Sequence, residues 1–246
     1  MPLTVENAKQ LIDDFMLRDA TFMLVNYNEP QVDKIYILDS SFNPPQNAHL
    51  SMCKLVPKDA QLLLLLSVKN ADKKAVPASF AERLVMMEAM ALDLQEARPI
   101  IGLCKHALFA DKAEAIHNSL HTASQSYLLG FDTLVRLLDP KYYEPQGIEQ
   151  ALGHFFASTK VMCVARPDVS SGLSEQEEYM RSIAKGDMKG IPAQWASRIT
   201  FATLRNGGEG VSSTAVRKAI KEKNDELVKS LVPPAVYQVL KELRPY

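Results

Sequence analysis

The stretch "KIYILDSSFNPPQNAH", residues 34–49, places a short apolar run before a polar segment that contains two prolines and ends at a histidine. The run at residues 35–38 is typical of a strand that is buried on both faces of a sheet. Pro44 and Pro45 fix the backbone and lack N–H donors, so they mark a loop. A helical pattern begins after them. The stretch therefore predicts a strand, a polar loop and a helix in direct succession.

The rest of the chain alternates apolar runs with helical patterns, which indicates a parallel sheet with helices on both faces. The predicted strands are residues 34–40, 61–68, 99–105, 126–131, 160–166 and 198–204. The predicted helices between them are residues 47–56, 78–96, 111–121, 132–139 and 174–186. We therefore expect an α/β fold with a Rossmann-like, doubly wound parallel sheet.

The two ends of the chain are predicted to add helices to this sheet. Residues 1–33 are expected to form an N-terminal helical extension. Residues 211–246 are expected to form a helical C-terminal segment that packs on the sheet, with Pro233 and Pro234 at one helix start. The chain has 246 residues, 47% of them hydrophobic, which is enough for one large core. We expect a single domain over residues 1–246.

Composition argues against several classes of protein. The net charge of −1 and the lack of a Lys/Arg cluster disfavour a nucleic-acid or membrane surface. No apolar run is long enough to span a bilayer, and the acidic N-terminus is unlike a secretory signal. Cys53, Cys104 and Cys163 lack metal-ligand spacing and predict buried thiols in a reducing compartment. The expected location is the cytoplasm, with the nucleus as a second location.

The loop after the first predicted strand has the composition of an anion site. Ligands of doubly wound sheets bind at the carboxyl ends of the strands, near the point where the strand order reverses. Ser40, Ser41 and Asn43 offer short polar side chains for phosphate oxygens. Asn47 is expected to cap the next helix, with His49 in its first turn, where N–H groups and the helix dipole favour an anion. The same residues are also compatible with a histidine that only packs or caps.

A second segment, "NGGEGVSSTAVRKAI" at residues 206–220, has a similar character. Its glycine-rich part precedes Ser212, Ser213 and Thr214, which predict a helix start with free N–H groups. Arg217 follows one turn later. Taken alone, serine or threonine at a helix start is usually only an N-cap, and the arginine is compatible with a solvated face.

Three segments together resemble a known family. "SSFNPPQNAH" is similar to the loop (G/S)SFNPxxxxH, "VSSTAVR" to the signature ISSTxxR, and "LLGFD" to the element GxD. These motifs are typical of the nicotinamide mononucleotide adenylyltransferases, within the nucleotidyltransferase superfamily. "LDSSFNPP", "NADK" and "PASFAERLVMM" further resemble a divergent fungal branch. The likeness spans residues 34 to about 240, whereas the motifs GxGxxG and GxxxxGK(S/T) of other nucleotide-binding folds do not occur.

The resemblance implies an activity. A phosphate of nicotinamide mononucleotide would attack the α-phosphorus of ATP, giving NAD and pyrophosphate without a covalent intermediate. His49 would bind the α-phosphate region, and Ser213, Thr214 and Arg217 the β- and γ-phosphates. Mg²⁺ would enter bound to ATP, with few protein ligands.

The resemblance also implies the remaining nucleotide-binding residues. They are Ser40, Ser41 and Phe42 in the phosphate loop, Gly130 and Asp132 beside the nucleotide, Ser212 at the second helix start, and Lys73 for the acceptor's phosphate. Gln46 stands where relatives have threonine or histidine. We expect its amide, at an exposed loop tip, to hold a phosphate oxygen.

Several alternatives stay open at this stage. The tryptophans that flank nicotinamide in related enzymes have no match, so Phe109, Tyr142 and Tyr143 are the candidates to stack on the base. Arg83 either forms a salt bridge or reaches substrate. The acceptor is either nicotinamide mononucleotide or another phosphate, such as phosphopantetheine or nicotinic acid mononucleotide. A nucleotide-binding regulatory protein with weak turnover is the alternative from another class, and a homo-oligomer is left open.

Overall fold

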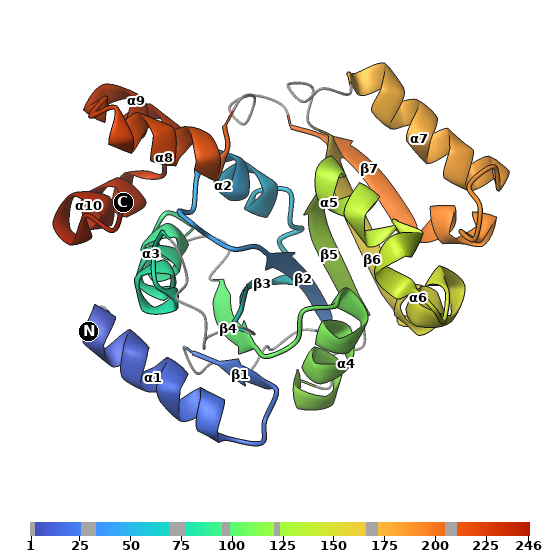
Figure 1. Ribbon diagram of the computed structural model, residues 1–246, viewed down its shortest axis with the longest axis horizontal. Coiled ribbons are helices and arrows are strands. Elements are labelled where there is room, and N and C mark those ends of the chain that lie inside the picture. Colours follow the sequence, from blue (N-terminus) through green and yellow to red (C-terminus); the bar gives the residue numbers. More distant parts are fainter. Residues whose placement is uncertain are drawn as a thin grey trace.

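A mostly parallel sheet forms the centre of the computed structural model, which describes residues 3–25, 33–68, 77–94, 99–120, 124–165, 172–204 and 211–246. Within these residues the strands run in the order β1-β4-β3-β2-β5-β6-β7 (Figure 1). Their bounds are β1 Phe22–Leu24, β2 Lys34–Asp39, β3 Gln61–Ser67, β4 Ile100–Cys104, β5 Ser124–Gly130, β6 Thr159–Ala165 and β7 Ile199–Thr203. The order reverses between β2 and β5, so the predicted doubly wound, Rossmann-like sheet is confirmed.

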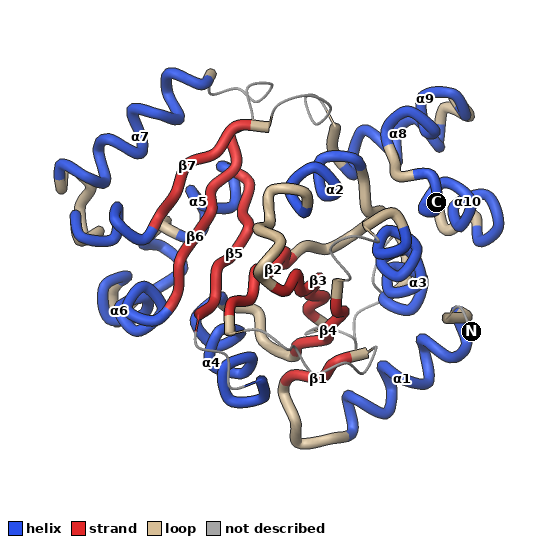
Figure 2. The backbone as a smooth tube through the Cα atoms, turned by 180° about the vertical axis from the view of Figure 1, so that it is seen from behind, coloured by secondary structure: helices blue, strands red, loops and turns tan. Residues whose placement is uncertain are grey.

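Helices cover both faces of this sheet (Figure 2). They are α1 Val5–Leu17, α2 Asn47–Cys53, α3 Phe80–Leu92, α4 Phe109–Leu120, α5 Phe131–Leu137, α6 Ile148–Ser158, α7 Leu173–Lys185, α8 Ser213–Lys221, α9 Asp225–Leu231 and α10 Pro234–Leu243. Two short 3-10 helices, η1 Pro140–Tyr143 and η2 Ala193–Arg198, complete the set within the described residues. Among the described residues, no helix is long and apolar enough to cross a lipid bilayer.

The apolar run of β3 shows how one sheet supports two cores. Leu62, Leu64 and Leu66 join a cluster with α1, α3, α8 and α10. Leu63 and Leu65 point to the opposite face and join a cluster with α4, α6 and η2. Successive side chains of a strand alternate between its faces, so a strand with helices on both sides must be apolar throughout.

The N-terminal region differs from the expected helical extension. Helix α1 forms as predicted, but it is followed by β1, which pairs antiparallel with β4 at the edge of the sheet. Phe22 of β1 packs so closely on Gly102 that a Cβ atom there would lie 2.8 Å from the Phe22 ring. Helix α6 is also absent from the predicted elements. The C-terminal helices reach the sheet through α3, against which α10 packs.

Candidate active site

The loop between β2 and α2 lies at the switch point of the sheet, beside β5. His49, in the first turn of α2, accepts a hydrogen bond at Nδ1 from the backbone N–H of Gln46, at 3.2 Å. Its Nε2 lies 3.0 Å from Ser40 Oγ. A neutral imidazole that accepts at Nδ1 carries its proton on Nε2. The His49 ring therefore presents a fixed N–H donor at the end of β2.

Gln46 has a different position from the one expected. Its side chain is 6% exposed and accepts from the backbone N–H of Ala48, so Gln46 is the N-cap of α2. The expectation that Asn47 caps the helix is wrong. Asn47 is the first helical residue, and its side chain donates to the carbonyl oxygen of Ser230 at 2.9 Å. The exposed loop tip predicted for Gln46 is likewise wrong, because a capping side chain is drawn in against the helix end.

Phe42 contributes to the loop by packing. Its side chain is fully buried, and its ring centroid lies 5.2 Å from that of His49. Its φ of 43° lies in the left-handed region, which a bulky residue rarely adopts. The buried ring restrains the His49 imidazole, and only the backbone of Phe42 is available to a nucleotide.

The start of α8 is hydrogen-bonded to this loop across more than 160 residues of sequence. Ser213 Oγ donates to the carbonyl oxygen of Pro44 at 2.8 Å. Arg217 donates from Nη1 to the carbonyl oxygen of Asn43 at 2.7 Å, and from Nη2 to Thr214 Oγ1 at 3.1 Å. The two polar segments singled out in the sequence therefore form one constellation.

Ser212 caps α8 by accepting from the backbone N–H of Ala215 at 3.1 Å. The positive end of the helix dipole lies at this turn, and its Ser213 side chain contacts the β2–α2 loop. Thr214 is exposed on the same turn. The residues of this segment thus place side-chain donors and positive potential beside the β2–α2 loop.

A second arginine, whose role the sequence leaves open, supports the same loop. Arg83 of α3 is 7% exposed and donates from Nε to the carbonyl oxygen of Ala78 at 3.1 Å. Its Nη1 lies 3.4 Å from the carbonyl oxygen of Ser41. Burial lowers the pKa of Arg83, and the nearby positive charge of Arg217 lowers it further. Two guanidinium groups therefore face one short loop, as expected of an anion site.

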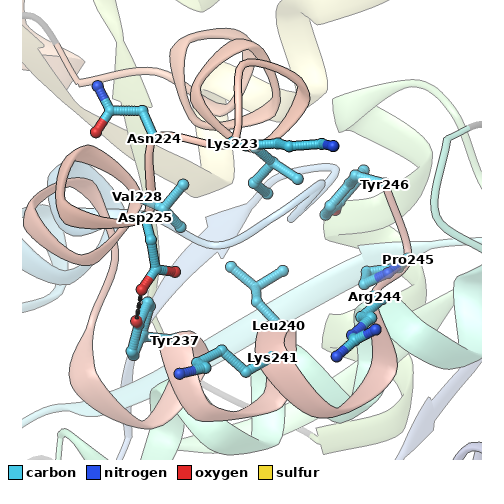
Figure 3. Close-up of a pocket in the computed structure, with 11 residues that line it drawn as sticks. Lys223, Asn224, Asp225, Val228, Tyr237, Leu240, Lys241, Arg244, Pro245 and Tyr246 are labelled. Atoms are coloured by element: carbon cyan, nitrogen blue, oxygen red, sulfur yellow. Dashed lines mark hydrogen bonds between the residues drawn. The ribbon is translucent and has the colours of Figure 1, made fainter.

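Tyr246 contacts the loop as well, which no pattern in the sequence indicated. Its hydroxyl donates to Asn43 Oδ1 at 2.9 Å. Burial raises the pKa of Tyr246, while the charges of Arg83 and Arg217 oppose the rise. The residue also lines an open cavity of about 520 Å³ between residues of α8, α9 and α10 (Figure 3).

A pocket of about 550 Å³ opens beside the loop, where β2 and β3 end. Ser40, Ser41 and Arg83 line it on the side of the loop, and Phe109, Tyr142 and Tyr143 supply its aromatic groups. Tyr143 is buried and donates from its hydroxyl to the carbonyl oxygen of Leu137, whereas Tyr142 is 51% exposed. All three aromatic candidates therefore line a single pocket next to the predicted phosphate site.

The other predicted site residues lie around this centre. Gly130 is the N-cap residue of α5, at the end of β5, and Asp132 is exposed in the first turn of that helix. Lys73 lies outside the described residues. Within the described ranges, no group of three His, Cys, Asp or Glu side chains is arranged to hold a metal ion.

A buried ion pair in the pocket is the main feature that the sequence did not indicate. The ammonium group of Lys112 contacts Asp39 Oδ2, and the two side chains are 6% and 7% exposed. Both residues line the pocket. Their separation of 73 positions leaves no local signal by which a sequence could reveal the pair.

Comparison with known proteins assigns the family. No family model matches the chain. A protein of Schizosaccharomyces pombe that bears the name "Putative nicotinamide mononucleotide adenylyltransferase" is 41% identical over 237 residues, which cover 96% of this chain and 95% of that protein. The chain belongs to the family of nicotinamide mononucleotide adenylyltransferases. The resemblance drawn from its three motifs is confirmed.

Solved structures agree with this family at the level of the fold. Plasmodium falciparum nicotinic acid mononucleotide adenylyltransferase, solved in complex with NaAD, superimposes with a TM-score of 0.59. The aligned part covers 86% of this chain and 96% of that one, at 13% identity. At so low an identity the likeness extends to the arrangement of strands and helices alone.

Proposed function

We propose that this chain transfers the adenylyl group of ATP to nicotinamide mononucleotide, giving NAD and pyrophosphate. The observation that carries the proposal is the pair of hydrogen bonds from Ser213 and Arg217 to the backbone of Pro44 and Asn43. They join the two family signatures around the ring of His49. A site with that composition is suited to a polyphosphate, because donors from two helix starts and two arginines converge on it.

His49 would stabilise the transferred group. Its Nε2–H, which in the free protein lies beside Ser40 Oγ, would turn to an α-phosphate oxygen when ATP binds. Negative charge increases there as the acceptor attacks, and a fixed donor in a water-poor site stabilises such charge. The Gln46 N–H bond and the Phe42 ring keep the imidazole in place before ATP arrives.

The start of α8 would bind the leaving group. Its N–H groups and Thr214 would contact the β- and γ-phosphates, and Arg217, which bonds to the loop, would also bind the pyrophosphate. Arg83 would add a second positive charge behind the loop. Mg²⁺ would enter as part of the ATP complex and bridge the phosphates. Gly130 and Asp132 would lie beside the nucleotide, and Lys73 would remain the candidate for the acceptor's phosphate.

The acceptor would occupy the pocket beside the loop. Its volume of about 550 Å³ is in the range of small-molecule sites. Phe109 and Tyr142 are the aromatic groups that would flank the pyridine ring, because Tyr143 is buried and held by Leu137.

A location in the cytoplasm and nucleus stays a prediction.

A direct assay tests this function. Purified protein is incubated with ATP, Mg²⁺ and one acceptor at a time, namely nicotinamide mononucleotide, nicotinic acid mononucleotide or phosphopantetheine, and the products are identified by mass. A dinucleotide from the nicotinamide compound together with pyrophosphate is the expected result. An adduct formed with phosphopantetheine alone would show that phosphopantetheine is the acceptor and that nicotinamide mononucleotide is not. Tight ATP binding without any adduct would favour a regulatory protein.

A further inference from the structure

Two opposite charges are buried at the floor of the acceptor pocket. Asp39 is the last residue of β2, and Lys112 lies in the first turn of α4. Their side chains are 7% and 6% exposed, and each lines the pocket. Burying such a pair is costly, and replacing it with apolar side chains is often neutral or stabilising. A buried pair that lines a pocket is therefore a candidate for a role in ligand binding.

The pair lies next to the group proposed to stack on the acceptor. The Lys112 ammonium is 5.0 Å from the centroid of the Phe109 ring. Ser67, at the end of β3, also lines the pocket, and its Oγ is buried without a hydrogen-bond partner among the described residues. A buried hydroxyl without a partner carries a desolvation cost that a bound polar group would relieve. The floor is thus polar where the pyridine ring would lie.

The hydrogen-bonding capacity of the pair is asymmetric. An ammonium has three N–H donors and no acceptor, whereas a carboxylate has only acceptors. The contact between Lys112 and Asp39 uses one donor and one carboxylate oxygen, Oδ2. The pair can therefore present to a ligand one donor and one acceptor side by side, with no net charge.

A carboxamide matches this arrangement, because it also carries one acceptor and one donor group. A carboxylate carries two acceptors and a negative charge, so one of its oxygens would face Asp39. Like charges in a partly dry pocket repel strongly. The same ion pair would therefore accept an amide and oppose an acid.

We propose that Asp39 and Lys112 determine acceptor specificity by hydrogen-bonding the carboxamide of nicotinamide mononucleotide and excluding the carboxylate of nicotinic acid mononucleotide. The inference rests on the proposed function, since it assumes that the acceptor's ring occupies this pocket. Arg83 and Arg136 also line the pocket, but Arg83 is directed to the phosphate loop and Arg136 is exposed and bonded to its own helix. The charge that faces the ring's substituent is that of the pair.

The decisive variant is Asp39→Asn. It keeps the size of the side chain, supplies an amide donor and leaves the Lys112 charge uncompensated, so the site now suits a carboxylate. In the wild type, the ratio of kcat/KM for the amide acceptor to kcat/KM for the acid acceptor is expected to be about 10 or more, as one hydrogen bond to a charged group would give. In Asp39→Asn this ratio is expected to fall about 10-fold or more. Equilibrium dialysis of the two mononucleotides without ATP should give the same change in the ratio of Kd values.

Two controls separate this role from a structural one. Asp59→Asn removes the carboxylate of an exposed ion pair with Lys34, whose atoms are 2.8 Å apart, and should leave the ratio unchanged. Asp39→Asn/Lys112→Met removes both charges, which avoids an unpaired buried charge, and should give a ratio between those of the wild type and Asp39→Asn. Thermal unfolding checks that each variant folds.

The outcomes distinguish this inference from the proposed function. If both acceptors are converted and Asp39→Asn leaves the wild-type ratio unchanged, the function stands and the role of the pair is refuted. If no acceptor yields a dinucleotide, the proposed function fails, and the dialysis ratio alone decides the pair. If the ratio of the two Kd values is then the same in the wild type and in Asp39→Asn, the specificity role is overturned.

Discussion

Two cavities of similar size differ in the placement of their charges. The pocket beside the β2–α2 loop, about 550 Å³, has Asp39, Lys112 and Arg83 buried in its wall. The cavity of the C-terminal helices, about 520 Å³, has an apolar floor that includes Val228 and Leu240 (Figure 3). Its charged groups are exposed at the rim. The two volumes are thus nearly equal, and the buried polar groups are what favours the first pocket as the proposed functional site, because such groups are costly unless they have partners.

One side chain links the C-terminal cavity to the β2–α2 loop. Tyr246 lines the C-terminal cavity, and its hydroxyl donates to Asn43 in the phosphate loop. The C-terminal helices therefore support the loop from behind. If the pocket with buried charges is the active site and the apolar cavity is not, variants in the β2–α2 loop should impair catalysis. Variants in the C-terminal cavity should then mainly change stability.

The largest effect is expected for His49→Ala. Loss of a donor to the transferred phosphate should lower kcat by about 100-fold or more, with a smaller change in KM for ATP. The change also removes the acceptor of the Gln46 N–H bond, so thermal unfolding should accompany the kinetics. His154→Ala, at an exposed position on α6, is the matched control and should behave like wild type. Near-normal turnover of folded His49→Ala would contradict the assignment.

Arg217 should rank second. Its two Nη atoms bond to Asn43 and Thr214 at once, which a single ammonium cannot reproduce in the same geometry. Arg217→Lys should lower kcat/KM for ATP by about 10-fold, and Arg217→Ala by about 100-fold. Lys218→Ala, at the exposed neighbouring position, serves as control. Wild-type ATP kinetics in both arginine variants would reduce Arg217 to a loop contact.

Leu240→Ala tests the other cavity. Its side chain is 7% exposed, and truncation should lower the free energy of unfolding by about 2–4 kcal/mol. Well below its melting temperature, the variant should keep kcat/KM within about twofold of wild type, because no buried polar group of the active site is altered. A folded Leu240→Ala protein with strongly reduced turnover would show that the C-terminal cavity belongs to the catalytic machinery.

The smallest effect is expected for Tyr246→Phe, which removes only the hydrogen bond to Asn43. Stability should fall by about 1 kcal/mol. Because burial raises the pKa of Tyr246, the hydroxyl stays protonated in the folded state, so the difference in Tm should be constant from about pH 6 to 9. Above about pH 10 the unfolded tyrosine ionises first, the wild type loses this stability, and the difference should shrink. A difference that instead grows above pH 10 would refute the buried, neutral hydroxyl.

Features that depend on local patterns could be predicted from the sequence. The apolar run of β3 must be a doubly buried strand because every one of its side chains has to leave water. The motifs at residues 40–49 and 211–217 carried the family, and their polar composition indicated an anion site. Short runs such as β1 have too few residues for any period, and only pairing with β4 makes a strand there.

The sequence by itself determined the alternation of the main strands and helices, the family, and the two polar segments proposed to bind phosphate, because periodicity and short motifs act over a few residues. Only the tertiary structure decided that Gln46 caps α2, that Tyr246 bonds to the β2–α2 loop, and that Asp39 meets Lys112 in the pocket beside that loop. These contacts join side chains from distant elements. Their partners depend on how helices pack across a sheet, and no local propensity encodes that packing.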